Sequence, residues 1–203
     1  MSQKSEINDT QLRELLYQAL ETELGGEQVY KQALKCVINE DLQEEWEAYL
    51  EETRTHQKIL RNVFEKLGLD STVQSTGRDV VHHIGKSLVD SMRIALESGG
   101  RAAAELVAAE CVVLAETKDH LNWELIGHVA EAARGDTARI LKSAHDEIED
   151  QEDHHLYHTR GFLRELWLDA LGLPAVLPPP EEVKNVKTAI GASRAEHARE
   201  QLM

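Results

Sequence analysis

The chain has 203 residues, 41% of them hydrophobic, and carries 37 acidic against 22 basic side chains, which gives a formal net charge of −15. A chain of this length can form one domain with a substantial core. The negative charge argues against nucleic acid and anionic membrane surfaces as partners, since both attract basic patches. The first ten residues are polar, and no apolar run reaches the roughly 18 residues of a membrane helix. We therefore expect a soluble, cytoplasmic protein.

The first long helical stretch follows polar residues 8–11, which can form a capping box. Its apolar stripe, with spacings of three and four residues, includes one carboxylate, Glu23. Tyr30 lies two turns further along this stripe, where its hydroxyl can bond a metal-bound carboxylate. Gly25 and Gly26 stand beside Glu23 inside the helix, where each costs roughly 1 kcal/mol against alanine. This cost indicates the close approach of another helix or of a ligand.

The chain breaks at residues 39–41, where Asp41 can cap a second helix that runs antiparallel to the first. The apolar stripe of this helix includes His56. A Glu-x-x-His motif would need a carboxylate three residues earlier, but that residue is Thr53. Glu52 can share a face with His56, so we expect both to be metal ligands. The alternative is a solvated Glu52 and a core histidine bonded to a neighbouring Glu.

A polar connection, residues 71–78, leads to an amphipathic stretch, residues 79–98, which ends at two glycines and forms a helix within a long crossover. A third long helix is expected from about Arg101 to Arg134. Two neighbouring stripes of this helix mix apolar residues with Glu and His, so periodicity alone does not identify its metal ligand.

The last long stretch contains a Glu-x-x-His motif, Glu152 to His155, on a stripe that is otherwise mostly apolar. A core-facing carboxylate needs a cation, since burying it alone costs at least several kcal/mol. Motifs of this kind on facing helices build dinuclear metal sites in four-helix bundles. The alternative is a solvated acidic face, because residues 146–153 are rich in Asp and Glu. Glu149 is a reserve candidate.

Depth along the bundle selects candidates on the third helix. Glu152 lies about four to five turns after the turn at residues 134–136, so a partner at similar depth lies about as far before that turn. Glu116 and His120 meet this condition, and Glu124 is the next choice.

Two helix pairs thus repeat one design, an inward Glu on the first helix and an inward Glu and His on the second. Residues 23–30 (ELGGEQVY) resemble the first-helix signature of bacterioferritins and rubrerythrins, and residues 152–155 (EDHH) are similar to their fourth-helix motif. Residues 50–69 are also similar to a bacterial family of stress-associated ferritin-like proteins. The resemblance covers about residues 9–172 and departs from the family at the second helix.

The resemblance implies an all-α, ferritin-like four-helix bundle of two antiparallel hairpins joined by a long crossover that contains an extra helix. We expect the bundle to span residues 1–173 and a Pro-rich linker and C-terminal tail to span residues 174–203. The expected cofactors are two transition metal ions, iron or manganese. The expected ligands are Glu23, Glu52, His56, Glu116, His120, Glu152 and His155, with Tyr30 orienting them.

Two classes of function remain open. The first is a non-haem dimetal oxidoreductase that reduces dioxygen or peroxide. The second is a non-catalytic bundle that stores or buffers metal, or a structural stress protein. Outside the inward stripes, the third helix carries an apolar arc that includes Ala108, Cys111, Val112 and Ala115, and this arc predicts a homodimer or larger homo-oligomer. Cys36 and Cys111 lack paired spacing and are expected to be inert core residues.

Overall fold

The computed structural model describes residues 7–176, which form five α-helices and no strand. They are α1 (Asp9–Ala33), α2 (Glu40–Lys66), α3 (Thr76–Ser98), α4 (Gly100–Ala132) and α5 (Gly135–Ala170). The prediction of an all-α protein is confirmed. The predicted tail, residues 174–203, falls outside the described residues apart from positions 174–176. Within the described chain, none of the helices combines the length and the apolar character needed to cross a bilayer.

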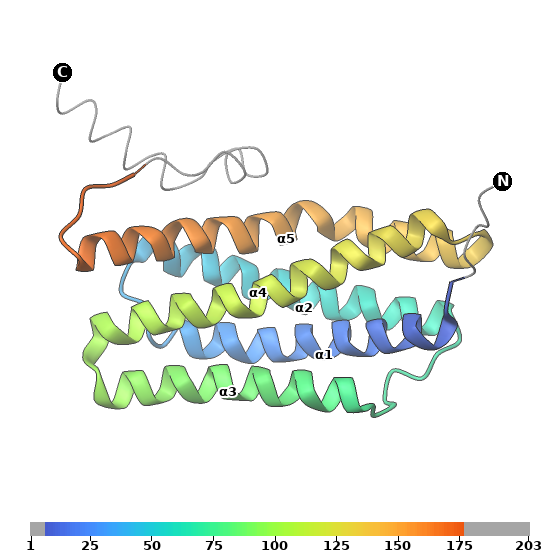
Figure 1. Ribbon diagram of the computed structural model, residues 1–203, viewed down its shortest axis with the longest axis horizontal. Coiled ribbons are helices and arrows are strands. Elements are labelled where there is room, and N and C mark those ends of the chain that lie inside the picture. Colours follow the sequence, from blue (N-terminus) through green and yellow to red (C-terminus); the bar gives the residue numbers. More distant parts are fainter. Residues whose placement is uncertain (1–6, 177–203) are drawn as a thin grey trace, which may run out of the picture.

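Four helices form a bundle, and the fifth lies on its outside (Figure 1). Helix α1 packs against α2 and α4, and α5 packs against the same two helices. Helix α3 packs on α1 and α4 and returns the chain along the bundle, so α2 and α4 run in the same direction (Figure 1). Two antiparallel pairs, α1–α2 and α4–α5, are thus joined by a crossover helix.

Polar side chains fix where the first three helices begin. The side chain of Asn8 caps α1, as expected from residues 8–11. Asn39, rather than Asp41, caps α2, because Asn39 has the extended backbone that a cap requires. Asp41 lies within the first turn, where its negative charge favours the positive end of the helix. Ser75 caps α3, which therefore begins at Thr76, three residues earlier than predicted.

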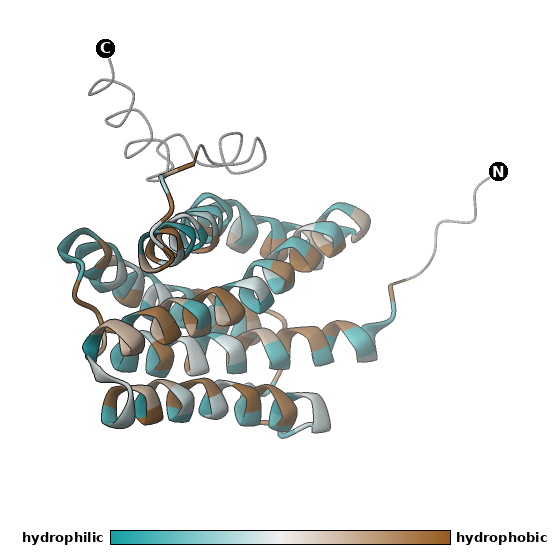
Figure 2. Ribbon diagram, turned by 60° about the vertical axis from the view of Figure 1, so that its left-hand side comes forward, coloured by the Kyte–Doolittle hydropathy of each residue, from teal (hydrophilic) through white to brown (hydrophobic). Residues whose placement is uncertain are grey.

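The apolar core consists of two clusters that lie toward opposite ends of the bundle. The first joins the end of α1 to the start of α2 and includes Trp46 and Phe162. The second joins the start of α1 to the end of α2 and includes Leu16, Phe64 and Trp123. All four bundle helices contribute to each cluster, and hydrophobic and hydrophilic residues alternate along each helix (Figure 2). The middle of the bundle is therefore enclosed by apolar residues toward both ends.

Glycines near Glu23 allow neighbouring helices to approach closely. A Cβ added to Gly25 would lie 3.9 Å from Gly85 Cα on α3, and one added to Gly85 would lie 3.6 Å from Gly25 Cα. A Cβ added to Gly26 would lie 3.6 Å from Thr53 Cγ2 on α2. The close approach predicted from the two α1 glycines is therefore made by helices.

The apolar arc of α4 is covered within the chain. Ala108, Cys111 and Val112 are buried in one core cluster with Met92 of α3. Our prediction that this arc forms a subunit interface is therefore wrong, because the crossover helix occupies it. A homo-oligomer stays a prediction without an assigned surface. Cys36 and Cys111 are free and buried, as expected.

Candidate metal centre

A layer of buried ionisable side chains lies between the two core clusters. It contains Glu23 from α1, His56 from α2, Glu116 from α4, and Glu152 and His155 from α5. Each occupies a position on an apolar helix stripe, so the packing that buries its neighbours also buries the charged group. The structure thus brings together five of the residues predicted as ligands.

Glu152 is the shared member of this layer. Its Oε1 lies 3.1 Å from His56 Nδ1 and 3.8 Å from His155 Nδ1. Each histidine also lies near a second carboxylate. His56 Nδ1 is 3.4 Å from Glu23 Oε1, and His155 Nδ1 is 3.5 Å from Glu116 Oε2. The ligand atoms form two groups, each within 4.8 Å: Glu23, His56 and Glu152, and Glu116, Glu152 and His155. Such a pair of groups has room for two adjacent ions.

Both histidines are held through the ring nitrogen that faces away from the layer. His56 Nε2 donates to Gln151 Oε1 at 2.7 Å, and His155 Nε2 donates to Glu52 Oε2 at 2.7 Å. Because these hydrogen bonds place a proton on Nε2, a neutral ring presents the Nδ1 lone pair to the centre. Metal-binding histidines are commonly oriented by such a second hydrogen bond.

The structure places Glu52 behind His155 and outside both groups of ligand atoms. Its side chain is 34% exposed. Thr53, which occupies the position of the missing Glu, is buried, and its hydroxyl donates to the Tyr49 carbonyl at 2.8 Å. In this geometry Glu52 orients His155 through a hydrogen bond. The sequence had predicted Glu52 as a metal ligand.

Replacing Glu52 with alanine is expected to weaken metal binding by about 10- to 100-fold, the usual cost of losing a partner of a metal-binding histidine. A centre that holds two ions should still fill at saturation, because the five inner side chains remain. Competition with a chelator of known affinity measures the change. Glu51→Ala is the matched control, since Glu51 is exposed on the same turn. A loss of binding as complete as in Glu152→Ala would make Glu52 a ligand.

Three other predicted residues lie outside the layer. His120 is partly exposed and bonds Asp153, with 2.8 Å between Nε2 and Oδ1. Glu124 and Glu149, the reserve candidates, are exposed. The structure therefore places Glu116 in the layer and His120 outside it, because depth along the bundle does not say to which side of α4 a residue points.

Asp119 is a buried carboxylate that our sequence reasoning missed. It is 5% exposed, and its Oδ1 has no hydrogen-bond partner. Burial, followed by the nearby charges of Glu23, Glu152 and Glu116, raises the pKa of Asp119 well above its usual value. Its spacing of three residues from Glu116 was a usable signal, since such residues share a helix face. His120, at a spacing of four, was chosen instead.

The buried layer holds more polar atoms than its hydrogen bonds satisfy. Atoms without a partner include Glu23 Oε2, His56 Nδ1, Glu116 Oε2, Asp119 Oδ1 and both carboxylate oxygens of Glu152. Buried polar atoms of this kind are rare in folded proteins. A proton or a metal ion, each of which accepts electron pairs, would satisfy these atoms.

Without metal, protons on the buried side chains compensate the negative charge of the layer. Burial raises the pKa of Glu23 to about 6, although His56 opposes the rise. Burial lowers the pKa of His56, but Glu23 and Glu152 outweigh it and raise the value to about 12. For His155, burial is likewise outweighed by Glu116 and Glu52, and its pKa rises to about 9. Both histidines are therefore protonated at neutral pH before metal binds.

Metal binding at pH 7 is expected to release at least two protons per chain, one from each histidine, because an imidazole must be neutral to bind a metal ion. Since these pKa values lie above neutrality, affinity should rise as the pH increases from about 6 to about 8. Calorimetric titration in two buffers of different ionisation enthalpy counts the protons. The variant His155→Ala should release fewer. Affinity that is independent of pH would contradict the expectation.

Comparisons with known protein families, with curated protein sequences and with solved structures found no match to this chain. The function is therefore inferred from the geometry and charge of the buried layer.

Proposed function

We propose that this chain is a ferritin-like dinuclear metal protein that acts as an oxidoreductase on dioxygen or peroxide, with two iron or manganese ions as cofactors. Glu23 and His56 would bind one ion and Glu116 and His155 the other. Glu152 would bind both. The single observation that carries the proposal is Glu152, which is 2% exposed and whose Oε1 lies 3.1 Å from His56 Nδ1 and 3.8 Å from His155 Nδ1.

The charges of the layer fit two divalent ions. An unpaired buried carboxylate costs several kcal/mol even after relaxation. Together with the neighbouring Asp119, the layer has four carboxylates, those of Glu23, Glu116, Asp119 and Glu152. Four negative charges match two divalent cations when both histidines are neutral. Carboxylate and imidazole donors suit iron and manganese, whereas both thiols of the chain are buried in the apolar core cluster of the α4 arc.

The chain topology supports a ferritin-like arrangement. Each antiparallel pair, α1–α2 and α4–α5, contributes a carboxylate from its first helix and a histidine from its second. The long connection between the pairs contains α3, which packs outside the bundle. This combination of inward Glu and His with a crossover is typical of dimetal carboxylate bundles.

Two adjacent redox-active ions would supply the electrons for reduction of the oxidant. The chain would close the site toward both ends of the bundle, where the apolar clusters lie. Tyr30 is fully buried, its hydroxyl has no hydrogen-bond partner, and its ring meets that of His155 edge-on at 6.1 Å. Burial and the charge of Glu116 raise the pKa of Tyr30, so the phenol keeps its proton. It can therefore donate a hydrogen bond to a small oxidant at the centre.

Metal content and oxidant turnover test this proposal. Protein purified without chelator from cells supplied with iron and manganese should contain about two ions per chain by elemental analysis. After anaerobic loading with Fe(II), repeated additions of dioxygen or hydrogen peroxide with an electron donor should each be consumed. Glu152→Ala should lack both properties, whereas Tyr30→Phe should retain the ions and react more slowly.

Three results would separate the alternatives. Absence of more than trace metal would overturn the proposal entirely. Two bound ions with no repeated consumption of oxidant would leave a metal-binding protein without oxidoreductase activity. Iron uptake far beyond two ions per chain would instead assign the bundle to storage.

A further inference from the structure

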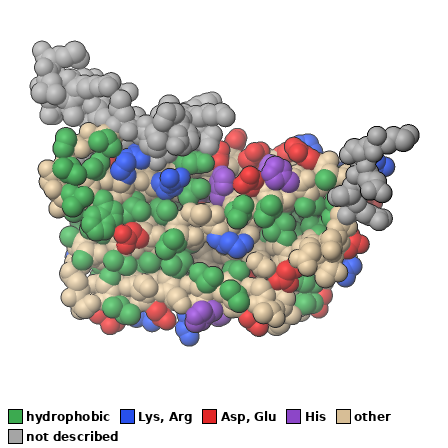
Figure 3. Space-filling view, viewed as in Figure 1, with side chains coloured by type: hydrophobic (Ala, Val, Ile, Leu, Met, Phe, Trp, Pro, Cys, Tyr) green, Lys and Arg blue, Asp and Glu red, His purple; other side chains and the backbone are tan. Residues whose placement is uncertain are grey.

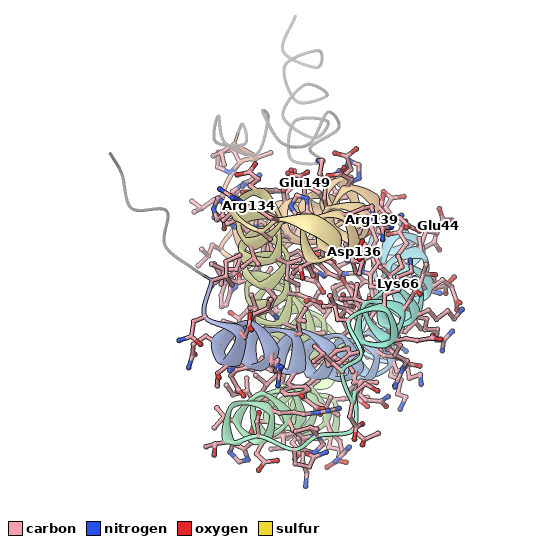
Figure 4. All side chains as sticks on the ribbon, turned by 90° about the vertical axis from the view of Figure 1, so that its right-hand side faces the viewer. Glu44, Lys66, Arg134, Asp136, Arg139 and Glu149 are labelled. Carbon is pink, nitrogen blue, oxygen red and sulfur yellow. The ribbon has the colours of Figure 1, made fainter. Side chains whose placement is uncertain are left out.

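A cavity between α4 and α5 opens at the surface and reaches Glu152 at the edge of the buried layer. Its volume is about 420 Å³, and its lining comes from the second half of α4 and the first half of α5. Acidic and histidine side chains gather on this side of the molecule in the space-filling view (Figure 3). Glu149, one of the lining residues, lies on the outer side of the α4–α5 layer, away from α3 (Figure 4).

The inner wall of the cavity includes Glu152. This carboxylate is the shared member of the metal centre, is almost fully buried, and has both oxygens unpartnered. Trp123 also lines the cavity and donates from Nε1 to Glu23 Oε1 at 3.0 Å. The cavity therefore reaches two residues that belong to or contact the centre.

The lining has the charge that attracts cations. It includes five acidic side chains besides that of Glu152, namely Glu124, Glu131, Asp146, Glu149 and Asp153. The single basic side chain of the lining, Lys142, is paired with Asp146 at 2.9 Å. Clefts lined by one sign of charge concentrate counter-ions and raise association rates by about 10- to 1,000-fold.

His145 provides a nitrogen donor along this route. Its Nδ1 lies 3.6 Å from Glu149 Oε2 and 3.7 Å from Asp146 Oδ1. A Cβ at Gly127 would lie only 2.4 Å from His145 Nε2, so the glycine leaves the room that this ring occupies. Oxygen and nitrogen donors thus stand near one another outside the buried layer.

We infer that this cavity is the route by which divalent cations reach the buried centre, with its acidic and histidine lining attracting them and Glu152 receiving them. The inference rests on the proposed metal binding at Glu152 and adds the path of access. It concerns the rate at which ions load, so it is tested separately from the occupancy of the centre.

The inferred route can be tested by blocking the cavity reversibly. Both native cysteines are buried, so a cysteine introduced as Glu124→Cys at the cavity lining can be labelled selectively with a bulky methanethiosulfonate. Co(II) uptake by metal-free protein is followed by its absorption after rapid mixing. The label should slow uptake at least about tenfold, leave the final amount of bound Co(II) unchanged, and lose its effect when reductant removes it. Glu97→Cys on α3, labelled in the same way, is the matched control, since Glu97 is exposed and does not line the cavity.

A second pair of variants tests the attraction of charge. Glu124→Lys with Glu149→Lys should slow Co(II) uptake at low salt, whereas Glu44→Lys with Glu97→Lys changes the net charge equally at exposed sites off the cavity and should not. Uptake by labelled Glu124→Cys at the unlabelled rate would overturn the inferred route. A wild-type protein that binds no Co(II) at equilibrium would instead overturn the proposed metal centre.

Discussion

If the chain binds two metal ions as proposed, replacing Glu152 with alanine is expected to abolish the binding of both. Glu152 belongs to both groups of ligand atoms, and no other carboxylate does. Its loss should lower affinity by more than the roughly 10- to 100-fold that a partner outside the centre costs. Elemental analysis after dialysis measures the retained metal.

Two further variants control this experiment. Glu152→Gln keeps the size of the side chain and removes its charge, so it should fold and still bind poorly. Asp150→Ala removes an exposed carboxylate two residues away and should retain both ions. Retention of two ions by Glu152→Ala would show that Glu152 does not bridge them.

Loading the centre with metal is expected to raise the melting temperature. A ligand that binds only the folded chain adds about 4 kcal/mol when its concentration is about 1,000 times Kd. In a domain of this size, that stabilisation corresponds to a rise of roughly 10 °C. The physical reason is that two cations would neutralise the four buried carboxylates of the layer. Differential scanning calorimetry with Mn(II) and with chelator measures the difference.

The Glu152→Ala variant separates this effect from nonspecific binding to an acidic surface. Its melting temperature should be the same with Mn(II) and with chelator, because the surface charges remain and the centre does not. A wild-type melting temperature that is unaffected by metal would contradict the expectation.

The sequence predicted the long helices because their apolar stripes are regular and their ends carry polar caps or glycines. Glu23, His56, Glu152 and His155 were found from such stripes, whereas Glu116 was selected by its depth along the expected bundle. A charged residue that interrupts an apolar stripe must be buried with its neighbours, so periodicity locates it without any knowledge of the fold. The function inferred from these residues stays a proposal.

The spacing of apolar residues does not decide which of two residues on the same helix turn faces the core. Asp119 and His120 both follow Glu116 at a helical spacing, and only the packing of α4 against its neighbours decides which of them faces inward. Glu52 illustrates a second limit, since a side chain that bonds a ligand and one that is a ligand have the same spacing from His56. Burial of the apolar arc of α4 by α3 depends on where the chain places α3. The spacing of apolar residues along a helix does not predict that placement.

The position of the charged layer midway between two apolar clusters also bears on engineering of this scaffold. The connections between consecutive helices lie at the ends of the bundle (Figure 1), with one or other cluster between them and the ionisable residues. Exposed loops tolerate insertion when few buried contacts depend on them. Peptides or whole domains inserted in such connections should leave the interior intact, so the bundle can carry new binding functions at its ends while its centre is kept.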